Sequence, residues 1–275
     1  MDFPIARSYL FVPGNRPDRF TKAFAAGADA VIIDLEDAVP PAQKADARKA
    51  VVNWLLMGKT TLLRINGARS EWFQNDLELC AAPNVAGVVL PKAELVEDLA
   101  QVRRKANAGV QILPLVETAQ GYSNALSLAR AQSVQRLIFG ELDFQLDLGM
   151  HGDDEELLAF RSQLVLVSRV AGIQPPVAGI NTVIDDLERL RAHTLRSRRL
   201  GFGGKLLIHP KQIAVVHECF QPSQEEIEWA KRVLAAAAKS GGAAVAMNGE
   251  LVDHPIIAKA ETILQEAEHY SGRHL

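Results

Sequence analysis

The sequence predicts an α/β protein built as a (β/α)8 barrel, that is, a TIM barrel, with a small C-terminal helical module. Eight short apolar runs recur along the chain, and helix-length amphipathic stretches lie between them. The runs show little alternation of polar and apolar residues, as expected for parallel strands that are buried on both faces. An open doubly wound sheet is the alternative, but no Gly-x-Gly-x-x-Gly motif follows the first run, which favours the barrel.

Each strand is predicted from a run of Val, Ile, Leu or Phe that ends in glycine, proline or a polar residue. In chain order the predicted strands are 9–12, 30–33, 61–66, 87–92, 112–117, 137–140, 176–181 and 206–210. The predicted helices of the barrel are 19–26, 42–56, 95–106, 123–130, 155–171 and 184–200. The first strand ends at Pro13-Gly14, a pair that favours a turn.

The chain is predicted to have two domains, a catalytic barrel over residues 1–222 and a C-terminal extension over 223–275. In the extension, a helix at 224–239 precedes a short hairpin or loop at 245–255 and a last helix at about 256–270. About 50 residues are too few to hold a stable core alone. We therefore expect the extension to pack on its own barrel or on a neighbouring subunit.

Composition and net charge argue against several classes of function. A net charge of −3 over 275 residues gives no general attraction to nucleic acid or to an anionic membrane. No uncharged apolar run reaches the ~18 residues of a membrane span, and the first residues do not resemble a secretory signal. The two cysteines, Cys80 and Cys219, are far apart in the sequence and are expected to be reduced thiols of a cytoplasmic protein.

The main functional signal is a group of acids that follow buried strands. The second strand ends in Asp34-Leu35-Glu36-Asp37, and acids close to a core need a cation, a proton or a basic partner. In a TIM barrel the carboxyl ends of all strands meet at the catalytic face. The polar residues that follow the strands are Asn15, Arg16, Asp34, Glu36, Asp37, Arg64, Asn66, Lys92, Glu117, Asp143, Asn181 and His209.

Glu117 and Asp143 are the predicted metal ligands, because each follows an apolar strand and the two strands would be neighbours. Mg²⁺ prefers a few carboxylates, several waters and oxygens of the substrate. The absence of His-x-x-x-His and Cys-x-x-Cys argues against zinc. From the residues alone, pairing of both acids with lysines or arginines at the barrel rim is an equal alternative.

Arg64 lies within the third strand between apolar neighbours, and a buried arginine needs an anion. That anion is a substrate carboxylate, a developing enolate, or one of the acids Glu36 and Asp37. We expect Arg16, Asn66 and Lys92 to bind substrate together with Arg64. A lysine-type aldolase that uses Lys92 is an alternative.

Several segments, in order, resemble the citrate lyase β-subunit family, which includes the malyl-CoA and citramalyl-CoA lyases and belongs to the HpcH/HpaI-type aldolases. The segments are Arg7-Ser8-Tyr9-Leu10-Phe11-Val12-Pro13-Gly14, Asp34-Leu35-Glu36-Asp37-Ala38-Val39, Leu63-Arg64-Ile65-Asn66, Leu90-Pro91-Lys92, Gly201-Phe202-Gly203-Gly204-Lys205 and Ile208-His209-Pro210-Lys211-Gln212. The resemblance covers the chain from about Arg7 to the C-terminal helix.

The resemblance implies a Mg²⁺ site held by Glu117 and Asp143 and an anion-binding Arg64. It implies that Glu36 and Asp37 hold metal-bound waters and orient Arg64. The segment 249–255 matches a motif in which an aspartate from a neighbouring subunit acts as acid or base, so Asp253 is the candidate, although it could be a simple turn aspartate. A homotrimer or a dimer of trimers is the implied assembly.

The implied activity is cleavage of a 3-hydroxyacyl thioester, such as (S)-citramalyl-CoA or malyl-CoA, into acetyl-CoA and pyruvate or glyoxylate. A citrate lyase β-subunit that acts on a carrier-linked citryl group and a thioesterase are the alternatives. Two segments depart from the family pattern. Residues 178–183 carry no acid, and the segment Gly140-Glu141-Leu142-Asp143-Phe144 is bulkier than usual. Both departures are expected to alter the shape of the substrate pocket.

Overall fold

The computed structural model describes residues 6–152, 155–239, 245–247 and 250–271. The chain divides into two compact units, and the division falls between His217 and Glu218. This division lies a few residues before the predicted domain boundary at residue 222. It falls inside helix α10 (Ile213–Phe220), a helix that the sequence analysis did not predict.

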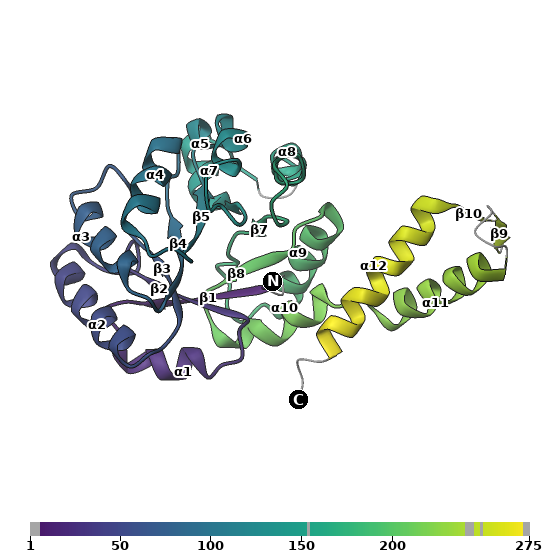
Figure 1. Cartoon of the computed structure of the whole chain (residues 1–275), viewed down its shortest axis with the longest axis horizontal. Helices are drawn as coiled ribbons and strands as arrows, with labels where there is room; N and C mark the ends of the chain where they lie inside the picture. Colours follow the sequence, from purple (N-terminus) through teal and green to yellow (C-terminus); the bar gives the residue numbers. More distant parts are fainter. Residues whose placement is uncertain (1–5, 153–154, 240–244, 248–249, 272–275) are drawn as a thin grey trace. The chain divides into compact units, whose positions relative to one another are not determined.

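The first unit is a closed barrel of eight parallel strands in sequential order, which confirms the predicted fold (Figure 1). Each predicted apolar run overlaps one observed strand. The strands are β1 (Ser8–Pro13), β2 (Ala30–Asp34), β3 (Thr61–Arg64), β4 (Val85–Leu90), β5 (Gln111–Val116), β6 (Ile138–Phe139), β7 (Val177–Ala178) and β8 (Gly204–Leu207). β1 pairs with both β2 and β8, and this pairing closes the barrel.

The strand register decides which functional side chains become neighbours. Asp34, the last residue of β2, lies opposite Arg64, the last residue of β3. Val116 lies opposite Phe139, so Glu117 follows β5 at the level where Gly140 follows β6. The register therefore forms two adjacent polar groups at one end of the barrel, one on β2 and β3 and the other on β5 and β6.

A packed apolar core fills the barrel interior below these polar groups, as in other barrels of this size. Seven of the eight strands contribute a buried side chain to it. The buried members are Tyr9, Ile32, Val89, Leu113, Leu115, Ile138, Val177 and Leu206. Because this interior is filled, the polar groups can meet a substrate only at the open end.

Helices alternate with the strands and surround the barrel (Figure 1). The predicted helices are observed with shorter ends as α1 (Phe20–Phe24), α2 (Lys44–Leu56), α4 (Val96–Lys105), α6 (Ala125–Ala129), α8 (Leu158–Ala171) and α9 (Leu187–Leu200). Besides α10, three short helices in the described part of the barrel were not predicted, namely α3 (Phe73–Leu77), α5 (Ala119–Ser123) and α7 (Glu141–Leu148). α7 begins directly after β6 and ends at Gly149, whose φ of 65° suits glycine. It is the helix that carries Asp143.

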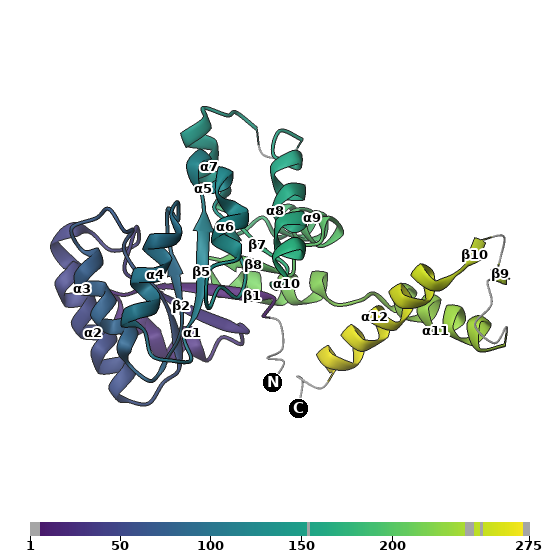
Figure 2. The ribbon, with the colours of Figure 1, turned by 45° about the horizontal axis from the view of Figure 1, so that its top comes forward.

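The second unit contains α11 (Gln224–Lys239), β9 (Val245–Met247), β10 (Glu250–Val252) and α12 (His254–Ser271). β9 and β10 pair antiparallel, so the predicted hairpin is present. α11 and α12 lie side by side in both ribbon views and share an apolar core that includes Val233, Val252 and Ala260 (Figure 2).

None of the helices in the described ranges is both long and apolar enough to cross a membrane.

Candidate active site

The first polar group at the open end is centred on Asp34 and Arg64. The Arg64 guanidinium donates two parallel hydrogen bonds to Asp34, from Nε to Oδ1 at 2.7 Å and from Nη2 to Oδ2 at 2.6 Å. Asp34 is 1% exposed and also accepts hydrogen bonds from the backbone N–H groups of Glu36 and Ala38. Its carboxylate thus has four donors. Such a saturated acid has little remaining capacity for a metal ion.

Arg64 contacts further acids and an aromatic ring. Its Nη1 lies 3.0 Å from Glu36 Oε2 and 3.7 Å from Asp37 Oδ2, and its guanidinium carbon lies 4.7 Å from the ring centre of Phe11. Burial alone would lower the pKa of Arg64, but Asp34 and Glu36 raise it by more, so the guanidinium stays positively charged. The sequence analysis named Glu36 and Asp37 as possible partners and missed Asp34, which makes the stronger contact.

A buried network of hydrogen bonds holds the backbone at Leu35 and Glu36 in place. Lys44 Nζ donates to the carbonyl oxygens of Leu35 and Glu36 and to Asn66 Oδ1, each at 2.7 Å. Asn66 in turn donates from Nδ2 to Leu35 O and to Asp76 Oδ2. Both N–H bonds of the Asn66 amide are therefore used within the protein, so the structure favours a positioning role for Asn66 over direct substrate contact.

The second polar group is centred on Glu117, which is 2% exposed. Its Oε1 accepts a hydrogen bond from the Lys92 backbone N–H at 2.8 Å. Lys92 adopts φ of 47°, a left-handed conformation that costs a non-glycine residue about 1–3 kcal/mol. A Cβ atom at Gly140 would lie 2.5 Å from both Cβ and Oε2 of Glu117, so only glycine fits there. The end of β6 is therefore shaped around the Glu117 side chain.

The Lys92 ammonium lies among three carboxylates from different strands. Nζ is 3.2 Å from Glu36 Oε1, 3.9 Å from Glu117 Oε1 and 3.8 Å from Asp143 Oδ1. Burial alone would lower the pKa of Lys92, but Glu36 and Glu117 raise it. Burial, with the charges of Glu36 and Asp143, raises the pKa of Glu117 to about 8. This group of acids therefore needs more positive charge than one ammonium supplies.

The donor set fits a hard divalent cation. Glu117 and Asp143 offer carboxylate oxygens from the ends of adjacent strands, and Asp143 is half-exposed toward the mouth of the barrel. Glu36 Oε2 is buried and, although close to Arg64, has no partner in hydrogen-bond geometry. Within the described ranges no three Asp, Glu, His or Cys side chains converge as a complete metal cage. Two carboxylates completed by water and substrate oxygens are the coordination that Mg²⁺ prefers.

A cavity of about 470 Å³, here called the mouth pocket, lies at the open end of the barrel beside both polar groups. Acidic and apolar side chains line it, together with Arg64. Its lining residues are Phe11, Pro13, Asp34, Asp37, Ala38, Arg64, Leu115, Glu117, Gly140, Glu141, Leu142, Asp143, Gly179, Ile180, Leu206 and Ile208. It brings the predicted metal ligands and the predicted anion-binding arginine to one place.

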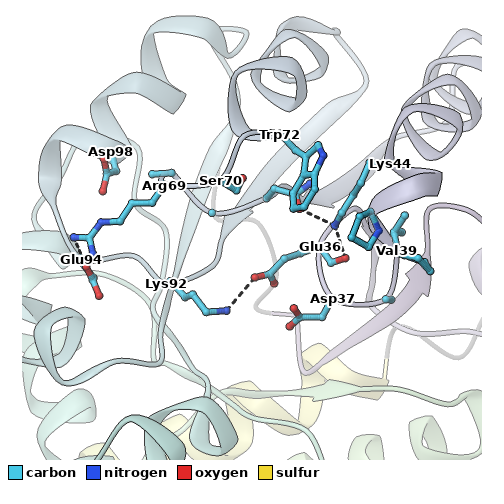
Figure 3. Close-up of a pocket in the computed structure, with 16 residues that line it drawn as sticks. Glu36, Asp37, Val39, Lys44, Arg69, Ser70, Trp72, Lys92, Glu94 and Asp98 are labelled. Atoms are coloured by element: carbon cyan, nitrogen blue, oxygen red, sulfur yellow. Dashed lines mark hydrogen bonds and ion pairs between the residues drawn. The ribbon is translucent and has the colours of Figure 1, made fainter.

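A second cavity of about 610 Å³, here called the side cavity, shares Asp37 and Ala38 with the mouth pocket. It lies among the loops that follow β2, β3 and β4. Figure 3 shows Lys92 reaching toward Glu36 and Arg69 reaching toward Glu94 in this cavity. Trp72 contributes an aromatic wall and contacts Lys44. Glu36 and Lys92 line the side cavity, and the Lys92 ammonium also lies within 4 Å of Glu117 and Asp143, which line the mouth pocket.

Arg16 is not part of this group of contacts, and Asp253 belongs to the second compact unit. Arg16 is half-exposed and forms a two-point ion pair with Asp18, and it lines neither cavity. Asp253 lies at the start of α12, where its Oδ1 accepts a hydrogen bond from Ile256 N at 3.4 Å. The first residue of its motif, Gly249, lies outside the described residues. The catalytic role of Asp253 stays a prediction.

Comparison with known proteins places the chain in a family. The sequence pattern described as HpcH/HpaI aldolase/citrate lyase matches residues 7–210, and a pattern described as a C–C bond lyase of the TIM-barrel fold matches residues 168–272. A citrate lyase subunit beta-like protein of Deinococcus radiodurans is 36% identical, over 94% of this chain and 96% of its own length. A (3S)-malyl-CoA thioesterase of Cereibacter sphaeroides is 34% identical, over 95% of this chain and 94% of its own length.

A solved structure agrees with these sequence matches over nearly the whole chain. The protein CitE from Mycobacterium tuberculosis, crystallised in complex with magnesium, acetoacetate and coenzyme A, superposes with a TM-score of 0.85 at 34% identity. The match covers 96% of this chain and 98% of that one. Fold, strand-end acids and sequence thus agree, and the chain belongs to the HpcH/HpaI aldolase/citrate lyase family of carbon–carbon lyases.

Proposed function

We propose that the protein is a Mg²⁺-dependent lyase that cleaves a 3-hydroxyacyl thioester carrying a carboxylate on its hydroxyl-bearing carbon. (S)-Citramalyl-CoA and malyl-CoA are the proposed substrates, and acetyl-CoA with pyruvate or glyoxylate are the products. The observation that carries the proposal is the mouth pocket, where Glu117 and Asp143 lie beside the firmly charged Arg64. The relative crystallised with magnesium and coenzyme A supports both the cation and the thioester.

In the proposed reaction the hydroxyl group loses its proton and the adjacent carbon–carbon bond breaks. The bonding electrons move to the carbon next to the thioester carbonyl, and the hydroxyl-bearing carbon becomes the 2-oxo carbonyl carbon of the acid. The electron-rich carbon then takes up a proton to become the methyl group of acetyl-CoA. No oxidant or reductant is required, so the site must supply only charge stabilisation and proton transfer.

Each residue of the site has a proposed task. Glu117 and Asp143 would hold Mg²⁺, which when bound supplies a Lewis acid for the carboxylate and hydroxyl oxygens. Arg64, fixed by Asp34, would stabilise the negative charge that develops as the bond breaks. Glu36 and Asp37 would orient Arg64 and hold water near the metal. Lys92 would contribute positive charge beside Glu36, Glu117 and Asp143.

Asp253 is the proposed proton donor to the acetyl carbon, and a neighbouring subunit of a homotrimer or a dimer of trimers would supply it. The resemblance of residues 249–255 to the family motif supports this role. Light scattering of the purified protein tests the assembly. Asp253→Asn tests the role, because a proton donor is needed for turnover but not for metal binding. An unchanged kcat in this variant would remove Asp253 from the mechanism.

We also propose that the protein is cytoplasmic. Cys80 and Cys219 are both buried and neither is in a disulfide, which supports a reducing compartment. Fractionation of cells that express the protein at native level tests this location.

The decisive experiment follows the products. Purified protein with Mg²⁺ is given (S)-citramalyl-CoA, malyl-CoA or citryl-CoA, while the 2-oxo acid and free CoA are measured separately. The proposal predicts pyruvate or glyoxylate in equal amount to acetyl-CoA, and loss of both in EDTA. Free CoA without a 2-oxo acid would instead identify a thioesterase, the activity for which the Cereibacter relative is named. Activity with citryl-CoA alone would identify a citrate lyase β-subunit.

A further inference from the structure

Six large apolar side chains, here called the apolar wall, line the mouth pocket. Three of them belong to strands, and the other three follow β6, β7 and β8. These residues are Phe11, Leu115, Leu142, Ile180, Leu206 and Ile208. Phe11 and Ile180 also pack on the barrel core, so this surface continues the interior of the protein. A group that contacts it gains free energy by leaving water only if it is itself apolar.

The rest of the pocket carries more acids than bases. Five of its lining side chains are acids, and among the described lining residues Arg64 is the one cation. Arg64 is already bound by Asp34 and lies 3.0 Å from Glu36, while Glu141 pairs with Arg161 at 3.0 Å. Lys92 lies at the side cavity, within 4 Å of three carboxylates. After one Mg²⁺ and one substrate carboxylate, the described lining has no second cation for another carboxylate.

Two of the apolar wall residues stand where the sequence departs from the family pattern. Leu142 occupies the bulky segment between Glu141 and Asp143, and its side chain is 48% exposed. Ile180 occupies the acid-free segment that follows β7. Both residues line the mouth pocket, so these sequence departures change the surface that a substrate would meet.

We infer that the mouth pocket selects a 2-oxo acid whose substituent is a short, uncharged alkyl group, and that Leu142 and Ile180 determine this specificity. The inference rests on the proposed lyase function and narrows it. Pyruvate and 2-oxobutyrate fit the pocket, glyoxylate lacks the group that would contact the apolar wall, and oxaloacetate would place a second carboxylate against it. In the cleavage direction the corresponding substrates are 3-hydroxyacyl thioesters with a methyl or ethyl group on the hydroxyl-bearing carbon.

The reaction run toward condensation measures this preference directly. The protein, acetyl-CoA and Mg²⁺ are combined with pyruvate, 2-oxobutyrate, glyoxylate or oxaloacetate, and kcat/KM is measured for each acid. We expect pyruvate to exceed glyoxylate about tenfold, the effect of one methyl group in an apolar pocket. We expect pyruvate to exceed oxaloacetate about 100-fold, because an unpaired like charge costs several kcal/mol.

A charge placed on the apolar wall should change the selectivity. Leu142→Lys adds an ammonium beside the proposed alkyl site, and we expect the pyruvate-to-oxaloacetate ratio to fall about tenfold or more, mainly through a lower KM for oxaloacetate. Leu142→Met keeps an apolar side chain and should keep the wild-type ratio. Leu146→Lys is the matched control, because Leu146 is one turn further along α7, is 81% exposed and does not line the pocket.

Ile180→Ala provides an independent test through volume instead of charge. The smaller side chain lengthens the alkyl site, so kcat/KM for 2-oxobutyrate should rise about tenfold relative to pyruvate. This readout is a ratio within one variant and therefore does not depend on how much of that variant folds.

The outcomes separate this inference from the proposed function. Equal or better use of oxaloacetate than pyruvate by the wild type would overturn the inference while leaving the lyase function intact. An equal change of ratio in Leu142→Lys and Leu146→Lys would also overturn it, because the effect would then come from net charge. No carbon–carbon bond formation with any of the acids would instead reject the proposed function.

Discussion

Two pairs of strands end in carboxylates at the same face of the barrel, but the acids differ in how fully they are paired. On β2 and β3, Asp34 accepts four hydrogen bonds, two of them from Arg64. On β5 and β6, Glu117 accepts one backbone hydrogen bond, and Asp143 has the distant Lys92 ammonium. Both sets look alike as strand-end acids. Glu117 and Asp143 retain the unfilled oxygens that a cation requires, whereas Asp34 does not, so saturation by donors separates a structural acid such as Asp34 from a metal ligand.

Loss of a β5–β6 carboxylate should have the largest effect on catalysis. Glu117→Gln keeps the shape of the side chain but removes the charge, so we expect kcat/KM to fall about 10³-fold or more. Far-UV circular dichroism and Tm should stay close to wild type, because Glu117 makes one hydrogen bond. Glu78→Gln, which alters an exposed acid paired with Lys105, is the control for loss of charge. Retained activity in Glu117→Gln, insensitive to EDTA, would contradict the assignment.

Loss of the β2 carboxylate should instead act on stability. Asp34→Asn removes the charged partner that accepts two hydrogen bonds from the buried Arg64, and breaking a buried pair costs about 3–5 kcal/mol. Urea unfolding of this variant, compared with Glu117→Gln, tests the contrast. Equal free energies of unfolding of the two variants would show that Asp34 is not a structural acid in contrast to Glu117.

The pH dependence of metal affinity should report on Glu117. In the metal-free protein the pKa of Glu117 is raised to about 8, so this carboxyl holds a proton at pH 6 and must release it to bind a cation. We expect Mg²⁺ affinity to rise by up to about tenfold per pH unit between pH 6 and 8 and to level off above that. Calorimetric titration in buffers of different ionisation enthalpy measures the released proton. A flat profile over this range would exclude Glu117 as a protonated ligand.

The raised pKa of Glu117 has the opposite effect on the stability of the fold. The folded protein binds more protons than the unfolded chain between the ordinary pKa of a glutamate, near 4.5, and about 8. Stability of the metal-free protein therefore falls as pH rises through this window. Glu117→Gln should lose that slope.

Gly140→Ala tests whether the backbone at the end of β6 shapes the proposed metal site. The added Cβ would lie 2.5 Å from Glu117 Cβ, an atom too close to the backbone to move aside easily. We expect Mg²⁺ affinity to fall about tenfold, with a smaller change in Tm than in Asp34→Asn. Gly67→Ala is the matched control, because its added Cβ would meet only Pro91 O at 3.7 Å. Similar affinities of the two glycine variants would show that Gly140 does not shape the site.

Lys92→Met should have the smallest effect. Its side chain is 47% exposed and compensates the acids only in part, so we expect the free energy of unfolding of the metal-free protein to fall by about 1 kcal/mol. Added Mg²⁺ should raise Tm more in this variant than in the wild type, because the cation then supplies the missing charge. An equal rise in both proteins would indicate that Lys92 does not contribute to the charge balance of the site.

Much of this arrangement could be predicted, because the sequence marks where each strand ends. Apolar runs that stop at acids located Asp34, Glu117 and Asp143 at one face, and the barrel topology made the β5 and β6 acids neighbours. The pairing of Asp34 with Arg64 could not be predicted, because it depends on the β2–β3 register. A one-residue change of register would turn either side chain to the other face of the sheet.

Buried cations were the other features that sequence reasoning missed. Lys44 lies in the first turn of α2 and reads as a solvated helix residue, yet it is 5% exposed and donates to two loop carbonyls. Lys205 and Arg136 are also buried within barrel segments that appear ordinary in sequence. Their partners are mainly backbone oxygens of other segments, which leave no signal in the local pattern. α7 was missed because its acidic residues directly after β6 resemble a loop.

The account rests on the claim that the β5–β6 carboxylates hold the divalent cation. Binding of Mn²⁺, a paramagnetic substitute for Mg²⁺, can be measured by electron paramagnetic resonance in wild type, Asp143→Asn and Asp37→Asn. Asp143 and Asp37 are both half-exposed or exposed acids that line the mouth pocket, so the two variants remove the same charge from the two compared regions. The account predicts that Asp143→Asn weakens Mn²⁺ binding at least about 100-fold, whereas Asp37→Asn weakens it less than tenfold. The reverse order would contradict it and would place the metal at the β2–β3 group.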